Sequence, residues 1–176
     1  MATSCFAAAR IRFLFGALCL FALSAQAAPK EGDVPPDYVG RLADGTDVRI
    51  SDYAGKAVVL SFWATWCPYC LKELPVLNAI QVSPAKDQIQ VIAVNTEERD
   101  VFRAASRALA PSFSLKLAYD PGKSARNAYG VNGIPHLVII GKDGKIVRVL
   151  RGYAESALPQ IVDDINQAIA AAPDAK

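Results

Sequence analysis

The run from Ala57 to Trp63 is apolar except for Ser61, and a Cys-x-x-Cys motif at residues 67–70 follows it closely. An unbroken run of this kind predicts a central strand that is buried on both faces. Residues 71–81 continue with a helical pattern, so the motif would lie at a helix N-terminus. Unpaired backbone N–H groups there favour a thiolate and can lower the pKa of a cysteine from ~8.5 to ~3.5–7.5.

Two thiols at this spacing are suited to dithiol–disulfide exchange. Cys67, at the expected helix start, is the candidate nucleophile, and Cys70, one turn deeper and more buried, is the candidate resolving thiol. A structural zinc site would need two more ligands, and His136 is the chain's only histidine. A copper site built from Cys67, Cys70 and His136 suits Cu(I) and stays open as an alternative.

The N-terminus has the parts of a secretory signal peptide. Two arginines precede the apolar run of residues 13–23, and Ala25-Gln26-Ala27, with small residues at its first and third positions, forms a cleavage pattern. Cleavage after Ala27 would remove Cys5 and Cys19 and leave one cysteine pair, which in an exported protein indicates catalysis rather than a disulfide framework. If the segment stays uncleaved, it would act as a membrane anchor. We therefore expect a periplasmic protein, soluble or anchored at its N-terminus.

Three parts are expected along the chain: a signal peptide over residues 1–27, an extended tether over 28–37 and one domain over 38–172. The tether is rich in proline and charge. The whole chain has 19 basic and 17 acidic residues, and loss of the two arginines in the signal peptide leaves a net charge of zero. This balance argues against a nucleic-acid partner. A monomer is expected.

Strand and helix signals alternate along the domain. They predict a hairpin around Asp44-Gly45, strands at 89–95 and 115–118, helices at 97–109 and 123–129, a hairpin of 136–140 with 146–150, and a closing amphipathic helix at 155–171. Strand, helix and strand in succession imply parallel pairing with right-handed crossovers. Pro75 is expected to kink the helix of residues 71–81.

With this order of elements, the motif at 66–70 and the later Gly133-Ile134-Pro135, the chain resembles the thioredoxin superfamily. Within it, the chain is similar to the TlpA/ResA-like group of exported thiol-disulfide oxidoreductases, over residues 34–170. The resemblance implies an α/β thioredoxin fold, with a central mixed sheet flanked by helices and an N-terminal β-hairpin extension. It also implies that Cys67 attacks a disulfide, that Cys70 resolves the mixed disulfide, and that no cofactor is needed.

The resemblance implies roles for residues outside the motif. Ile134 and Pro135 fall where the family places a cis-proline loop that pairs with the substrate backbone, whereas a trans proline opening an edge strand is the alternative. Glu73 lies one turn after Cys70, where desolvation would raise its pKa and make it the proton acceptor for that thiol. Ser61 stands where cytosolic thioredoxins carry a buried aspartate. The alternative for Glu73 is an ordinary exposed helix residue.

Three further side chains are predicted to contact substrate. Trp66 should lie at the rim of the site, and Tyr69, inside the motif, should be partly exposed. His136 stands where most relatives carry a small hydroxyl residue, and it would tune Cys67, bind metal or contact substrate because imidazole titrates near working pH. A half-exposed strand histidine without such a role is the alternative. Trp63 is expected to pack in the core.

We therefore expect a thiol-disulfide oxidoreductase that reduces disulfides in exported partner proteins, in cytochrome c maturation or copper-site assembly. A membrane thiol reductant would return the electrons. The direction rests on family analogy, and because exchange is reversible, a thiol oxidant of exported proteins is an open alternative. A Cu(I)-binding chaperone using Cys67, Cys70 and His136 is the alternative from another functional class.

Overall fold

The apolar run before the cysteines forms strand β3 (Ala57–Trp63), and all seven of its residues are buried. The computed structural model describes residues 27–172, so the predicted signal peptide, apart from Ala27, lies outside the described residues. β3 pairs in parallel with β4 (Ile89–Asn95) and antiparallel with β6 (His136–Ile140). The prediction of a central strand buried on both faces is confirmed.

Seven strands form one mixed sheet in the order β2-β1-β5-β4-β3-β6-β7. The other strands are β1 (Tyr38–Arg41), β2 (Asp47–Arg49), β5 (Lys116–Tyr119) and β7 (Ile146–Arg151). β1 and β2 form the predicted N-terminal hairpin, and β1 joins the sheet antiparallel to β5. The expected mixed sheet with a hairpin extension is confirmed.

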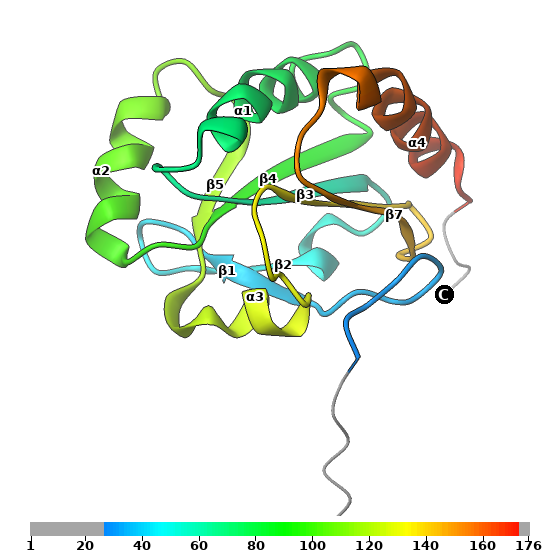
Figure 1. Ribbon diagram of the computed structural model, residues 1–176. Helices are drawn as coiled ribbons and strands as arrows, with labels where there is room; N and C mark the ends of the chain where they lie inside the picture. Colours follow the sequence, from blue (N-terminus) through cyan, green and yellow to red (C-terminus); the bar gives the residue numbers. More distant parts are fainter. Residues whose placement is uncertain (1–26, 173–176) are drawn as a thin grey trace, which may run out of the picture.

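Helices cover both faces of this sheet (Figure 1). α1 (Pro68–Gln81) and α4 (Leu158–Ala170) lie on one face, and the short α3 (Ser124–Ala128) lies on the other. α2 (Arg99–Leu109) packs beside β5, where the ring of Phe102 stacks on Tyr119 at 4.9 Å between centroids. Within residues 27–172, no helix is long and apolar enough to cross a bilayer.

The sheet separates two apolar clusters, because successive strand residues point to opposite faces. The cluster beneath α1 and α4 contains both cysteines, Val59 of β3 and Leu137 of β6. The cluster on the α3 side contains Val58 of β3 and Val138 of β6. This alternation decides which side chains share a face with the cysteines.

The proline-rich segment before β1 lies against the domain. Backbone hydrogen bonds join Gly32 N–H to the Ile146 carbonyl (2.8 Å) and Ile146 N–H to the Asp33 carbonyl (2.9 Å). Farther along, the hydroxyl of Tyr129 donates to the carbonyl of Pro36 at 2.6 Å. Residues 32–36 of the proposed tether are therefore in contact with the folded domain.

Several element boundaries differ from the expected ones. α1 begins at Pro68, directly after the expected helix start at Cys67, and it continues through Pro75 to Gln81. The helix expected at 123–129 is a short turn (Pro121–Lys123) followed by α3. The closing helix, expected over residues 155–171, is a short turn (Glu155–Ala157) followed by α4, on which Val162 is 49% exposed.

Candidate active site

Cys67 and Cys70 are joined by a disulfide at the N-terminus of α1. Cys67 is the N-cap residue, and its Sγ accepts a hydrogen bond from the Cys70 backbone N–H at 3.2 Å. Pro68 occupies the first helical position, where a missing N–H has no consequence. The remaining unpaired N–H groups of the first turn would stabilise a Cys67 thiolate in the reduced protein.

Both cysteines are buried. Cys67 is 3% exposed and Cys70 is 0% exposed, and both belong to the cluster beneath α1 and α4. Cys70 is thus the more buried of the two, as expected. The order of attack by Cys67 and resolution by Cys70 stays a prediction.

Glu73 lies one turn beyond Cys70 on α1 and is 3% exposed. Its Oε2 accepts a hydrogen bond from the hydroxyl of Ser61 on β3 at 2.6 Å. Burial raises the pKa of Glu73 to about 7, and the Ser61 hydrogen bond opposes that rise. A carboxyl group with a pKa near 7 can accept and return a proton at neutral pH. The predicted burial and raised pKa of Glu73 are confirmed.

The peptide bond between Ile134 and Pro135 is cis, as the resemblance implied. Pro135 is buried, and its carbonyl accepts a hydrogen bond from Gly152 N–H at 2.8 Å. Ile134 is half-buried and packs against the cluster that contains Cys67 and Cys70. The loop is thus fixed to the segment after β7 and packs against the cluster to which the disulfide belongs.

Large apolar side chains on and next to the motif are exposed to solvent. Trp66 is 70% exposed, Tyr69 58% and Leu71 48%. The Nζ of Lys72 lies 6.0 Å from the centre of the Tyr69 ring. Exposed aromatic and aliphatic groups gathered at one place are typical of a surface that binds another molecule.

His136 is fully buried, contrary to the half-exposed alternative. Its ring meets the edge of Phe62 at 6.1 Å between centroids, and neither ring nitrogen has a hydrogen-bond partner within residues 27–172. Burial, with a smaller effect from the positive charge of Arg151, lowers the pKa of His136 to about 4. The imidazole is therefore neutral at physiological pH.

The copper ligand set of Cys67, Cys70 and His136 is not assembled. Leu137 points into the cluster that contains the cysteines, so its neighbour His136 points to the opposite face of the sheet. In the part of the chain that the structure describes, no group of three or more His, Cys, Asp or Glu side chains could hold a metal ion. The oxidised structure therefore does not bring His136 together with Cys67 and Cys70, and the buried ring presents no surface to a substrate.

The sequence reasoning missed Glu97, which follows β4. Its two carboxylate oxygens accept hydrogen bonds from the backbone N–H (2.6 Å) and the hydroxyl (2.9 Å) of Thr65. Asn95 fixes the carboxylate, because its amide donates to Glu97 at 3.1 Å and accepts from the Glu97 N–H at 2.8 Å. The loop two residues before Cys67 is thereby tied to the end of β4. Polar residues after a buried parallel strand were the available signal.

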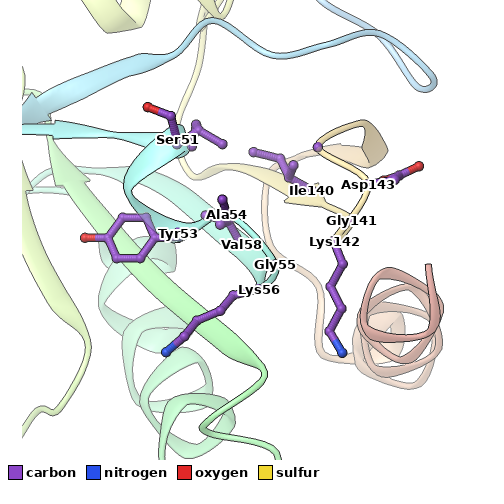
Figure 2. Close-up of a pocket in the computed structure, with 12 residues that line it drawn as sticks. Ser51, Tyr53, Ala54, Gly55, Lys56, Val58, Ile140, Gly141, Lys142 and Asp143 are labelled. Atoms are coloured by element: carbon purple, nitrogen blue, oxygen red, sulfur yellow. The ribbon is translucent and has the colours of Figure 1, made fainter. Parts of the chain in front are cut away.

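A pocket of about 530 Å³ lies near the other end of β3 (Figure 2). Val58 and Ile140 line it, and the side chains of Lys56 and Lys142 point the same way along its rim. None of the predicted site residues contributes to this pocket. This pocket is therefore separate from the disulfide at the start of α1.

Known proteins share this arrangement. The AhpC/TSA family profile matches residues 32–149. The thiol-disulfide oxidoreductase ResA of Geobacillus thermodenitrificans is 33% identical over 123 residues, 69% of each chain. ResA of Bacillus subtilis is 33% identical over 125 residues, 69% of this chain and 68% of that one.

A Chlorobium tepidum structure assigned as a thiol:disulfide interchange protein DsbE superimposes with a TM-score of 0.72 and 29% identity. The match covers 81% of this chain and 99% of that one. The fold, the disulfide at the start of α1 and these similarities agree with one another. The chain belongs to the AhpC/TSA family and, within it, to the ResA-like thiol-disulfide oxidoreductases of thioredoxin fold.

Proposed function

We propose that this oxidoreductase works in the periplasm as a reductant of disulfides in exported partner proteins. The observation that carries the proposal is the Cys67–Cys70 pair at the start of α1, with the buried Glu73 one turn behind it. Apocytochrome c or a copper-site assembly protein would be the partner, and a membrane thiol reductant would supply the electrons. Export would follow from the signal peptide at residues 1–27.

The reaction uses three groups of this chain in succession. The Cys67 thiolate attacks the partner's disulfide, forms a mixed disulfide and releases one partner sulfur as a thiolate. Cys70 then gives its proton to Glu73 and attacks the Sγ of Cys67, which releases the second partner sulfur. The partner's disulfide becomes two thiols, and the dithiol of the protein becomes a disulfide. Two electrons and two protons from the membrane donor restore the reduced form.

The surface around the disulfide supports a protein-sized substrate. Trp66 and Tyr69 present exposed rings on either side of Cys67 in the sequence, and Ile134 lies half-buried in the cis-proline loop. Aromatic side chains of this kind supply large contact areas at binding surfaces. We propose that Trp66, Tyr69, Ile134 and Pro135 contact the partner around its disulfide.

The redox potential of the Cys67–Cys70 couple tests the direction of electron flow. Residues 28–176 are equilibrated with glutathione or dithiothreitol buffers, and the dithiol fraction is measured. A potential below about −200 mV, toward the ~−270 mV of thioredoxin, supports the reductant. A potential near ~−120 mV would reverse the direction and make the protein an oxidant of exported proteins.

Partner capture tests the substrate class. In the exported Cys70→Ser variant, Cys67 still attacks but the mixed disulfide is not resolved, so partners are expected to stay covalently bound. The matched control is Cys67→Ser, which should capture none in the same way. If both variants retain the same proteins, or neither retains any, the proposed order of attack is wrong.

A further inference from the structure

Ser61 is the one polar residue in the otherwise apolar β3, and its side chain is 0% exposed. We propose that Ser61 is a positioning residue for the resolving step. Its hydroxyl holds the Glu73 carboxylate in the ionised form that accepts the proton of Cys70. This inference rests on the proposed role of Glu73 and names the group that controls it.

The Glu73 carboxylate accepts a hydrogen bond from the Ser61 hydroxyl. The Ser61 hydroxyl reaches from β3 to the Oε2 of Glu73 on α1 at 2.6 Å, a short distance typical of a hydrogen bond to a charged oxygen. Within residues 27–172, it is the one side chain that hydrogen-bonds to Glu73. Because both residues are buried, water does not compete with this contact.

The buried cluster on this face of the sheet is apolar. It includes Val91 and Ala93 from β4, Leu137 and Ile139 from β6, and Ile161, Ile165 and Ala168 from α4. The buried acid of α4, Asp164, is paired with Arg148 at 3.0 Å. Within residues 27–172, burial and the Ser61 hydrogen bond are the two influences on the pKa of Glu73, and no charged neighbour contributes.

A carboxylate in such surroundings is unfavourable unless a donor compensates for the lost water. The Ser61 hydroxyl donates to the carboxylate, so it favours the ionised form and opposes the effect of burial on the pKa. Without this hydroxyl, the pKa of Glu73 would rise further. At neutral pH, a smaller fraction of the protein would then hold a base ready for Cys70.

The step that Ser61 controls can be observed on its own. When the reduced protein meets an excess of dithiobis(nitrobenzoic acid), Cys67 attacks the reagent's disulfide and releases one nitrothiobenzoate. Cys70 then loses its proton to Glu73, attacks the Sγ of Cys67 and releases the second nitrothiobenzoate. In stopped flow, the rate of the first phase depends on reagent concentration, whereas that of the second does not.

For Ser61→Ala, the pH midpoint of the second phase is expected to rise by about one unit. Its rate near pH 7 should fall by up to about tenfold, and the difference from the native protein should vanish well above the midpoint. Ser61→Thr, which keeps the hydroxyl, should restore the native midpoint. Ser124→Ala on α3 makes the same chemical change at an exposed site and should leave the midpoint unchanged.

A structural role alone would alter unfolding without moving this midpoint. An unchanged midpoint in folded Ser61→Ala would overturn the inference. The infrared carbonyl band of protonated Glu73, identified by its loss in Glu73→Gln, gives a second readout. Its titration midpoint should rise in Ser61→Ala, and a fixed midpoint would contradict the inference.

The Glu73→Gln variant separates this inference from the proposed function. If Glu73→Gln leaves the pH profile of the second phase unchanged, Glu73 does not accept the proton and the proposed mechanism fails. If Glu73→Gln removes the midpoint but Ser61→Ala does not shift it, the inference about Ser61 alone fails. Ser61→Ala added to Glu73→Gln should have no further effect on the pH profile.

Discussion

At Glu73, burial and a hydrogen bond act in opposite directions on one carboxyl group. Burial raises its pKa from 4.5 to about 7, even though the Ser61 hydroxyl favours the ionised form. The unfolded chain therefore releases this proton at a lower pH than the folded chain. Folding becomes less favourable as the pH rises from about 4.5 to about 7, because ionisation is easier in the unfolded state.

Glu73→Gln is expected to change how stability depends on pH. Relative to the native protein, the oxidised variant should gain stability between about pH 4.5 and pH 7, by roughly 3 kcal/mol in total. The amide does not titrate, so the penalty for a buried charge is absent above pH 7. Urea unfolding at both ends of this interval measures the difference. An identical pH dependence in the two proteins would show that Glu73 is not protonated in the folded state at neutral pH.

The sequence predicted the burial of Glu73 but not that of His136, for a physical reason. Glu73 is three residues after Cys70 on a helix, and this spacing alone places both on one side of α1. His136 follows Pro135 at the start of a strand, where successive side chains point to opposite faces of the sheet. Which face it takes depends on the pairing of β6 with β3, and that pairing is long-range.

At the level of elements, the loop before the cysteines depends on its neighbour β4. Glu97 accepts hydrogen bonds from the N–H and the hydroxyl of Thr65. The segment after β4 therefore holds the loop that follows β3. Glu97→Ala would leave this partly buried N–H unsatisfied. We expect a loss of about 1–3 kcal/mol in the free energy of unfolding and slower reduction of disulfide substrates.

The neighbouring Glu98 provides a matched control. It precedes α2, is exposed and makes no side-chain capping hydrogen bond. Glu98→Ala should therefore change the free energy of unfolding by less than about 0.5 kcal/mol. Denaturant unfolding of the two variants gives the comparison, and equal losses would contradict a specific role for Glu97.

Elements with a continuous local signal were predicted accurately. The bounds of β3 and β4 match the predicted ranges, because an unbroken buried strand is visible in any short window of sequence. The start of α1 was predicted at Cys67, and the helix begins directly after it, because Cys67 is the N-cap and Pro68 takes the first position. The Thr65–Glu97 contact joins residues 32 positions apart, which no local pattern reveals.

Over the whole molecule, residues 32–36 connect the N-terminal segment to the last strand and to the end of α3. The buried ring of Tyr129 donates its hydroxyl to the Pro36 carbonyl. We expect Tyr129→Phe to lower the free energy of unfolding by about 1 kcal/mol in a chain that begins at Ala28. In a chain that begins at Tyr38, the same substitution should have little effect or stabilise the protein. Urea unfolding of the native and Tyr129→Phe forms of both chains measures the difference. Equal effects in the two chains would show that Tyr129 is not coupled to residues 32–36.

His136 and Glu73 lie on opposite faces of the same sheet, and their titrations affect the fold in opposite senses. Because the pKa of His136 is depressed in the folded state, its contribution to the free energy of unfolding is lost as the pH falls from 6.5 to about 4. The contribution of Glu73 to the same free energy is lost as the pH rises from about 4.5 to about 7. The two slopes compensate, so the native chain should be less sensitive to mild acid than a variant lacking either group. The chain can thus keep a titrating carboxyl group in its core without a pH-sensitive fold.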